Sequence, residues 1–229
     1  MKIESLKRNG LLFYFINQEE FERLWKNIFK KEEYKIDLNN FKPLIFDIGA
    51  HIGLATLYFK SKYPQAEIIA FEPNPQTAKI FRLNIKANHL KKVKVIEAAV
   101  WNKKGHKSLY VDKISKNPWT WGDSLVENIW GNKIPPQSIL VKTLRLSSFL
   151  TKPVDLLKLD VEGTEYAIIK ESAKKLNLVK NIILEYHKTP KTNPENQLKP
   201  ILKILKEANF KFTFLEKDNV ILIKGNHET

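Results

Sequence analysis

The stretch LIFDIGAHIG at residues 44–53 constrains the fold of this 229-residue chain more than any other. Its apolar first half lacks alternating polar positions, which is typical of a parallel strand covered on both faces. Gly49 and Gly53 then permit a tight turn and a close approach of the backbone to a ligand. Because Asp47 stands near the end of the strand, we predict a strand, a turn and a helix around a crevice suited to a nucleotide-like ligand.

Strands and helices alternate along the rest of the chain. Apolar segments predict further strands at residues 67–72, 93–100, 153–160, 179–186, 210–215 and 220–223. A helix is expected after the glycine turn, and another begins at the N-cap Asn74 and Pro75. This order predicts an α/β, Rossmann-like fold with a seven-stranded, mostly parallel sheet, one antiparallel strand and helices on both faces.

Residues 1–42 are expected to form an N-terminal helical extension that packs on the core domain, residues 43–229. Residues 11–16 suit a strand, and residues 19–29 carry apolar side chains at helical spacing. Such a helix caps one edge of the core or forms a lid over the ligand.

An insert near residues 101–138 interrupts the regular pattern with glycines and prolines. Short strands are expected at residues 108–112 and 139–144. The insert holds four of the five tryptophans, Trp101, Trp119, Trp121 and Trp130. Long loops of this kind often form lids or binding loops, although the tryptophans also suit core packing of the insert itself.

Composition narrows the class of partner. The net charge of +14 favours an anionic partner, but nearly all basic residues are Lys, which equally suits a solvated surface. The absence of cysteine excludes disulfides and thiolate metal sites and favours an intracellular, cytoplasmic protein. No apolar segment approaches the length of a transmembrane helix.

Polar residues follow several predicted strands, at the sheet edge where ligands bind in open α/β folds. Glu72 ends the second strand, 23 residues after Gly49, where a carboxylate can accept hydrogen bonds from both ribose hydroxyls. The glycine pattern of nicotinamide-binding turns is broken by His51 and Leu54, and no phosphate-binding loop is present. These features fit S-adenosylmethionine, which has a ribose but no phosphate.

Four segments resemble the FkbM-type methyltransferases: FDIGAHIG at 46–53, FEPNP at 71–75, Asn84 with Asn88, and KLDVEGTE at 158–165. The resemblance covers roughly residues 43–215 and implies a class I, S-adenosylmethionine-dependent enzyme that O-methylates hydroxyls. His51 departs from the family, which usually has Asn there. It contacts the cofactor's amino-acid end or fills space over the sheet.

The resemblance also implies roles for individual residues. The cofactor-binding set is Asp47, Gly49, His51, Gly53, Glu72, Pro73, Ala98 and Asp160. The catalytic set is Asp160, Glu162 and His187, with Glu165 at the same reacting end. Simpler interpretations compete, because Asp47 suits a helix cap, and Glu162 and Glu165 suit a helix N-terminus. His187 likewise suits a loop histidine.

Methylation of a neutral hydroxyl needs a base, for which His187 and Asp160 are the candidates. We assign no metal ion, although the carboxylates of Asp160, Glu162 and Glu185 would suit Mg²⁺. The expected acceptor is a hydroxyl of a glycan, glycolipid or other small metabolite, and the basic charge favours an anionic one. The alternatives are an RNA methyltransferase on the same fold and a non-catalytic binding module.

Overall fold

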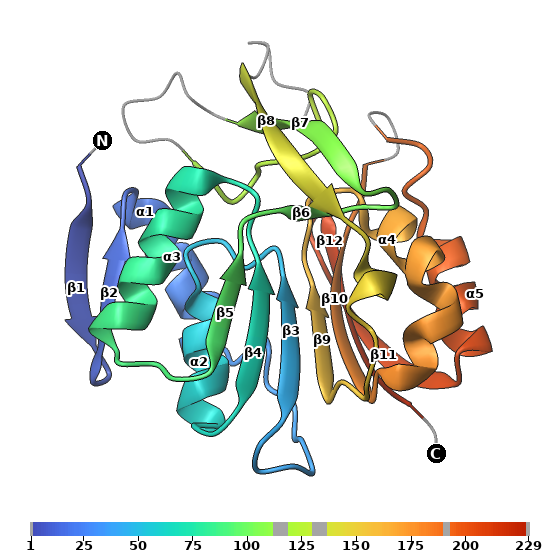
Figure 1. Cartoon of the computed structure of the whole chain (residues 1–229), viewed down its shortest axis with the longest axis horizontal. Coiled ribbons are helices and arrows are strands. Elements are labelled where there is room, and N and C mark those ends of the chain that lie inside the picture. Colours follow the sequence, from blue (N-terminus) through green and yellow to red (C-terminus); the bar gives the residue numbers. More distant parts are fainter. Residues whose placement is uncertain (1, 112–118, 130–136, 190–192, 228–229) are drawn as a thin grey trace.

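The computed structural model describes residues 2–111, 119–129, 137–189 and 193–227. Its main sheet has seven strands in the order β11-β12-β10-β9-β3-β4-β5 (Figure 1). All neighbours are parallel except β12, which runs antiparallel to both β10 and β11. The predicted seven-stranded sheet with one antiparallel strand is therefore confirmed. Its strands are β3 (Leu44–Ile48), β4 (Glu67–Phe71), β5 (Val93–Ile96), β9 (Leu156–Leu159), β10 (Asn181–His187), β11 (Phe210–Lys217) and β12 (Val220–His227).

Helices cover both faces of this sheet, as predicted. On one face, Ile45 and Ile68 pack in a cluster with side chains of α2 (Leu54–Lys62) and α3 (Pro75–Ala87). On the other face, Phe46 packs with side chains of α4 (Glu165–Ser172) and α5 (Leu198–Glu207). Because side chains alternate between faces, all five residues of β3 are buried, which explains its continuous apolar sequence.

The N-terminal region begins with a β-hairpin of β1 (Glu4–Arg8) and β2 (Leu11–Phe15), of which the sequence predicted only β2. Helix α1 (Gln18–Trp25) follows and continues as the π-helix η1 (Lys26–Lys30). Two side chains of α3 fasten β2 to the core. Asn84 Oδ1 and Asn88 Oδ1 accept hydrogen bonds from the backbone N–H groups of Tyr14 and Leu12, at 2.6 and 2.8 Å.

The strand predicted at residues 93–100 is divided, which corrects the prediction. The N–H of Ala98 donates to the carbonyl of Ile96 at 3.0 Å, and this tight turn directs the chain away from the main sheet. Residues 99–100 form β6, which pairs with β8 in a second sheet of order β6-β8-β7. The other strands of that sheet are β7 (Gly105–Val111) and β8 (Gln137–Leu144).

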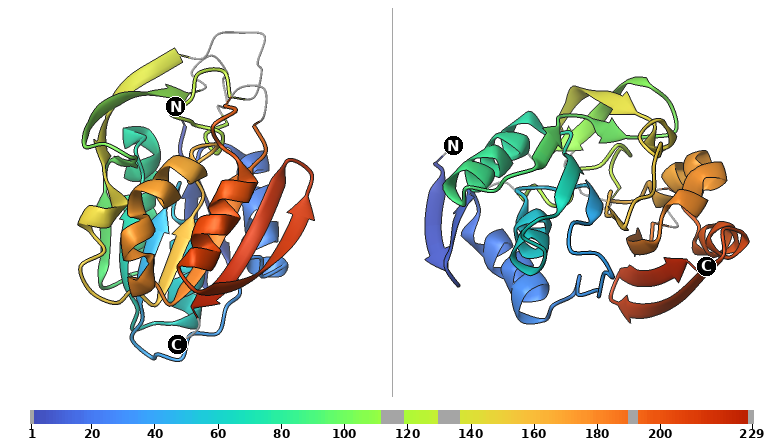
Figure 2. Two further views of the ribbon diagram at one scale, coloured as in Figure 1. Left: turned by 90° about the vertical axis from the view of Figure 1, so that its right-hand side faces the viewer. Right: turned by 60° about the horizontal axis from the view of Figure 1, so that its bottom comes forward.

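The insert is therefore partly regular, because all of β7 pairs antiparallel with residues 137–143 of β8. Trp130 lies outside the described residues. Two short 3-10 helices, η2 (Leu146–Ser148) and η3 (Ala173–Leu178), complete the described elements. Figure 2 shows the small sheet lying beyond one end of the main sheet. None of the helices in the described part of the chain is long and apolar enough to cross a membrane.

Candidate active site

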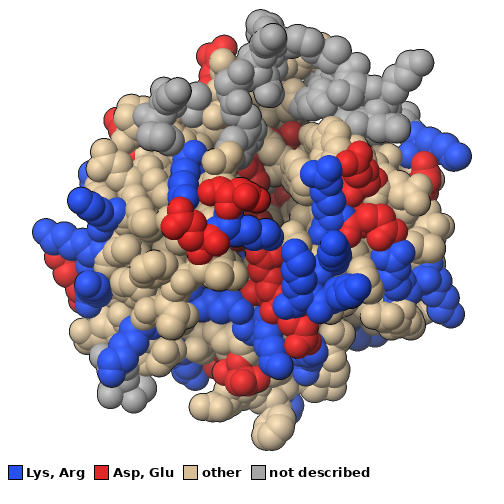
Figure 3. Space-filling view, turned by 180° about the vertical axis from the view of Figure 1, so that it is seen from behind, with Lys and Arg blue, Asp and Glu red and all other residues tan. Residues whose placement is uncertain are grey.

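A cavity of about 880 Å³ lies at the carboxyl ends of the core strands. Residues from β3, β4, β9 and β10 line it, together with residues of the N-terminal region and the insert. Six carboxylates but only two lysines belong to its described lining, so its interior is acidic. Figure 3, seen from behind, shows acidic side chains within a hollow of the surface and lysines near its rim.

The glycine turn is required by close packing against neighbouring chain segments. Gly49 has a φ of +74°, and a Cβ there would lie 1.7 Å from the carbonyl oxygen of Asp160. Gly53 has a φ of +88°, and its Cβ would lie 2.1 Å from the ring of Phe81. Gly49 lines the cavity, whereas Gly53 is not among its lining residues. Both glycines are therefore required by another segment of the same chain, and the close approach of a ligand to this turn stays a prediction.

Asp47 lies beneath the cavity and does not line it. Its fully buried carboxylate accepts a hydrogen bond from Thr56 Oγ1 at 2.8 Å, which ties β3 to α2. Lys158 Nζ lies 3.5 Å from Asp47 Oδ1 and 3.3 Å from Asp160 Oδ2, and it donates to the Gly49 carbonyl at 2.8 Å. Asp47 thereby positions the turn and a buried lysine.

Lys158 was not singled out from the sequence, although a lysine inside an apolar strand is a signal that could have revealed it. Burial alone would lower the pKa of Lys158, but the nearby carboxylates of Asp160, Asp47 and Glu185 hold it above the ordinary value. The ammonium group is therefore charged and joins the turn after β3 to the end of β9.

Glu72 lines the cavity at the end of β4 and is buried. Its two carboxylate oxygens accept hydrogen bonds from the backbone N–H groups of His51 and Asn74, at 2.8 and 2.9 Å. Burial raises the pKa of Glu72 to about 7, although both hydrogen bonds favour the ionised form. Pro73 and Ala98 line the same cavity. This end of the cavity therefore presents a carboxylate that is held in one position next to apolar side chains.

His51 links the turn to the insert. Its Nε2 lies 2.6 Å from Thr120 Oγ1, and burial lowers the pKa of the imidazole. The carboxylate of Glu20, on α1, accepts hydrogen bonds from the backbone N–H groups of Thr120 and Trp121, at 2.6 and 2.7 Å. Sequence reasoning missed Glu20, because it reads as one of several surface acids of an amphipathic helix.

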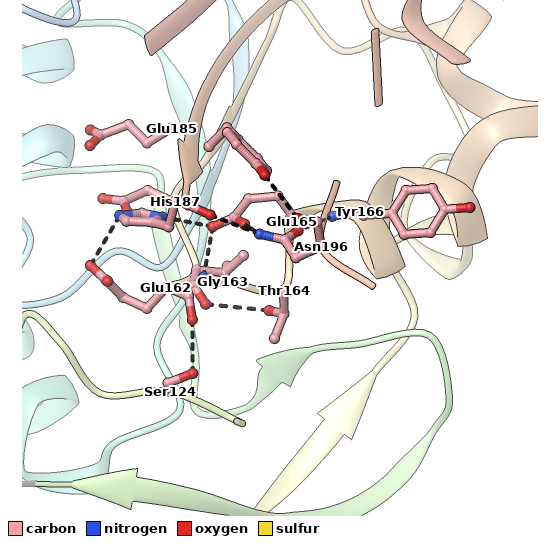
Figure 4. Close-up of polar contacts among 12 residues, drawn as sticks. Ser124, Glu162, Gly163, Thr164, Glu165, Tyr166, Glu185, His187 and Asn196 are labelled. Carbon is pink, nitrogen blue, oxygen red and sulfur yellow. Dashed lines mark hydrogen bonds and ion pairs between the residues drawn. The ribbon is translucent and has the colours of Figure 1, made fainter. Parts of the chain in front are cut away.

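Carboxylates surround His187 at the opposite end of the cavity (Figure 4). His187 Nδ1 lies 2.7 Å from Glu165 Oε1, and Nε2 lies 3.4 Å from Glu162 Oε1 and 3.8 Å from Asp160 Oδ1. Burial would lower the pKa of His187, but Glu162 and Glu165 hold it well above the ordinary value. The structure thus brings together all three residues predicted to be catalytic.

Glu165 does not line the cavity and orients His187 instead. Its carboxylate also accepts hydrogen bonds from the N–H of Gly163 at 3.0 Å and from Asn196 Nδ2 at 2.7 Å. Glu165 is fully buried, so these contacts fix the ring of His187. The predicted electrostatic role at the start of α4 is compatible with this position.

Tyr34 and Glu185 complete the cluster. The Tyr34 hydroxyl, from the N-terminal region, donates to Glu185 Oε1 and lies 3.5 Å from Asp160 Oδ2. Burial, reinforced by Asp160, raises the pKa of Glu185 to about 7. Tyr34 had no signal in the sequence beyond its aromatic character. The arrangement provides several carboxylates able to accept a proton beside a cavity that can hold organic ligands.

Comparison with known proteins assigns the chain that carries this site to a family. Residues 47–212 match the domain described as "Methyltransferase FkbM domain". The chain belongs to the FkbM methyltransferase family. The resemblance stated from sequence is thereby confirmed, and the matched segment contains Glu72, the Asp160 segment and His187. This protein is a methyltransferase, which decides against a non-catalytic binding module.

Curated relatives agree with this assignment. The methyltransferase is 30% identical over 216 residues to "Methyltransferase sdnD" of Sordaria araneosa, covering 80% of this chain and 81% of that protein. It is 26% identical over 176 residues to "2-O-methyltransferase NoeI" of Sinorhizobium fredii, covering 71% of each.

Solved structures support the fold. A methyltransferase FkbM from Methylobacillus flagellatus superposes with a TM-score of 0.56 and 10% identity, over 88% of this chain and 47% of that chain. TYW2 of M. jannaschii, solved in complex with AdoMet, superposes with a TM-score of 0.51 and 15% identity, over 97% of this chain and 84% of that chain. At these identities the likeness shows the class I methyltransferase fold alone.

Proposed function

We propose that this methyltransferase uses S-adenosylmethionine to O-methylate a hydroxyl of a glycan, glycolipid or other small metabolite. One observation carries the proposal. Glu72 and the cluster of Asp160, Glu162 and His187 line the same cavity. A group suited to ribose and a group suited to proton transfer therefore face the same cavity.

The residues present fit S-adenosylmethionine. Glu72 is held rigidly by two backbone donors, and each carboxylate oxygen retains capacity for a further hydrogen bond from a ribose hydroxyl. Pro73 and Ala98 provide apolar surface nearby, and Gly49, His51 and Asp160 line the cavity as well. Asp47 and Gly53 contribute indirectly, by shaping the turn. When bound, the cofactor supplies a methyl group activated on a sulfonium.

At the other end, Asp160 and Glu162 are the candidate proton acceptors. Their side chains are 23% and 16% exposed, whereas that of His187 is 4% exposed. His187 carries a proton at neutral pH, because the surrounding carboxylates raise its pKa. We therefore assign His187 to holding and orienting the two carboxylates, and assign proton removal to one of them. Holding the acceptor oxygen in line with the methyl group supplies much of the acceleration.

The acidic interior favours a neutral polyhydroxyl acceptor over the anionic one that the net charge suggested. Six carboxylates line the cavity, and an anionic acceptor would be repelled by them. Trp119 and Trp121 also line it, with ring centroids 4.8 Å apart, and offer an apolar surface for a sugar ring. The relative named as a 2-O-methyltransferase supports a hydroxyl as the acceptor class.

The test combines binding and transfer. Calorimetry with S-adenosylmethionine is expected to show one binding site, and Glu72→Gln is expected to weaken binding by about 10-fold or more, since hydrogen bonds to a charged group contribute roughly 1.5–3 kcal/mol. Glu67→Gln is the matched control, because Glu67 begins the same strand and is exposed.

Methyl-labelled cofactor is then supplied with monosaccharides, glycolipids and RNA. Label in a sugar hydroxyl supports the proposal. Preferential labelling of RNA, with binding that weakens steeply as salt rises, would favour the RNA alternative. Absence of cofactor binding by the wild-type protein would overturn the choice of methyl donor.

A further inference from the structure

Asp160, Glu185 and His187 form a cluster in which each side chain offers one ligand-type atom. These three atoms, two carboxylate oxygens and one imidazole nitrogen, all lie within 4.8 Å of one another. Atoms that share one cation at about 2.0–2.4 Å have separations in this range. All three residues line the cavity, so the point is open to a small molecule bound there.

Other groups of the protein hold each of the three side chains in place. Asp160 Oδ2 contacts Lys158 Nζ at 3.3 Å, and Glu185 Oε1 accepts the hydrogen bond of Tyr34. His187 Nδ1 is held by Glu165 at 2.7 Å, which turns Nε2 toward Glu162 (Figure 4). Nε2 also lies 3.8 Å from Asp160 Oδ1. A carboxylate that orients an imidazole through its second nitrogen is the usual support of a metal-bound histidine.

The charges around this point are unbalanced. Asp160, Glu162, Glu165 and Glu185 bring four carboxylates together, against Lys158 and His187. Even with the imidazole charged, the fully ionised cluster has an excess of negative charge. Glu165 is fully buried and the other three carboxylates are partly buried, where uncompensated charge is costly, and a divalent cation lowers that cost. This charge excess is a separate reason, beyond the spacing of the atoms, to expect a cation.

We propose that Asp160, Glu185 and His187 form a binding site for a divalent transition-metal cation of the Mn²⁺ class. An imidazole binds a metal only as the neutral ring, so the cation displaces one ring proton of His187 when it binds. An imidazole nitrogen favours ions of this class over Mg²⁺, which prefers oxygen ligands and keeps its waters. The sequence alone had suggested a purely carboxylate set with Glu162. The structure exchanges Glu162 for His187 and leaves the Glu162 carboxylate 3.4 Å from Nε2, beside the ion rather than among the three ligands.

The role of the ion rests on the proposed O-methylation. The acceptor hydroxyl oxygen coordinates the cation, which makes its proton more acidic, and Glu162 accepts that proton. The oxygen lone pair then forms the O–CH₃ bond while the S–CH₃ bond breaks, and the bonding electron pair stays on sulfur as a neutral thioether. Asp160, as a ligand, fixes the geometry, so Glu162 rather than Asp160 is the base.

The experiment measures metal binding without cofactor or acceptor. Full-length protein freed of metal with a chelator is titrated with Mn²⁺ by calorimetry and by electron paramagnetic resonance. We expect one site per chain, lost in Glu185→Gln. Because an outer partner of a metal ligand typically contributes 10–100-fold, Glu165→Gln is expected to weaken binding by about 10-fold or more. Glu207→Gln, an exposed carboxylate on α5, is the matched control and is expected to bind normally.

The proposed site would be overturned if the wild-type protein bound neither Mn²⁺ nor Zn²⁺ at millimolar concentration. Equal losses of Mn²⁺ affinity in Glu185→Gln and Glu207→Gln would overturn it as well. Thermal unfolding with and without Mn²⁺ provides a second readout if a variant folds poorly, because a bound ion raises the wild-type midpoint. Binding without methyl transfer would keep the site and reject the proposed function. Full methyl transfer by metal-free protein that does not bind Mn²⁺ would keep the proposed function and reject the metal site.

Discussion

The carboxylate of Glu20 accepts a hydrogen bond at 2.6 Å from the backbone N–H of Thr120, a hundred residues later in the chain. The N–H of Trp121 donates to the same oxygen, and Thr120 Oγ1 contacts His51 Nε2. One buried acid of the N-terminal helix therefore holds a segment of the insert against the glycine turn. The N-terminal region is thus part of the cavity wall, since Tyr34 and Leu24 line the cavity too.

Glu20→Ala is expected to loosen the segment at residues 119–121. One buried and one part-buried N–H group would lose their acceptor, at about 1–3 kcal/mol each, so the free energy of unfolding falls by roughly 2–6 kcal/mol. Hydrogen exchange of the Thr120 and Trp121 amides is expected to accelerate. Glu19→Ala, at an exposed neighbour on the same helix, is the control. Unchanged exchange in Glu20→Ala would contradict this assignment.

Gly49→Ala is expected to prevent normal packing of the turn. A Cβ at residue 49 would lie 1.7 Å from the Asp160 carbonyl oxygen, so backbone must move, and we expect a loss of about 3 kcal/mol or more. Gly10→Ala is a close control, because Gly10 has a similar φ of +78° and nothing within 4 Å of the added atom. It is expected to lose only about 1–2 kcal/mol, the cost of the left-handed backbone. Denaturant unfolding of both variants measures the difference, and equal losses would show that sterics at residue 49 do not matter.

Lys158→Met is expected to destabilise the protein by about 3–5 kcal/mol, because it leaves Asp47 and Asp160 without their buried cation. Lys180→Met removes a lysine whose side chain is 60% exposed, from a buried partner, Asp155, that keeps hydrogen bonds from Asn40 Nδ2 and the Leu44 N–H. Because the cation of this pair is largely solvated, we expect a loss of about 1 kcal/mol, so this variant serves as the comparison. Chemical denaturation is the measurement. A loss at Lys158 no larger than at Lys180 would reject the structural role of the buried lysine.

The affinity for S-adenosylmethionine is expected to rise as the pH increases through about 7. Burial raises the pKa of Glu72 from 4.5 to about 7, and the ionised carboxylate is the better acceptor for ribose hydroxyls. The raised pKa of Glu72 has the opposite effect on the stability of the free protein. Because the folded-state pKa is the higher one, the contribution of Glu72 to stability declines as the pH rises from about 4.5 through 7. Calorimetry between pH 6 and 8 tests the affinity, and Glu72→Gln should abolish this part of the pH dependence. A flat wild-type profile would contradict the assignment.

Most of the fold could be predicted from the sequence because local patterns report burial. The continuous apolar strand at residues 44–48, and Asn74 with Pro75 at the start of α3, each specify an element through local chemistry. The split at Ala98 could not be predicted. The apolar residues Ala99 and Val100 continue the strand-like pattern beyond it, and only pairing with β8 moves them into another sheet.

The sequence by itself determined which residues end the core strands, and therefore that Glu72, Asp160, Glu162 and His187 meet at one sheet edge. Chain order and strand polarity are enough for that, because parallel strands end on the same side. Only the tertiary structure decided which side chains face the cavity and which lie beneath it. Asp47 is turned inward to Lys158, while Glu20 and Tyr34 reach the site from the N-terminal region. Such contacts join residues roughly a hundred or more positions apart, and no local pattern encodes them.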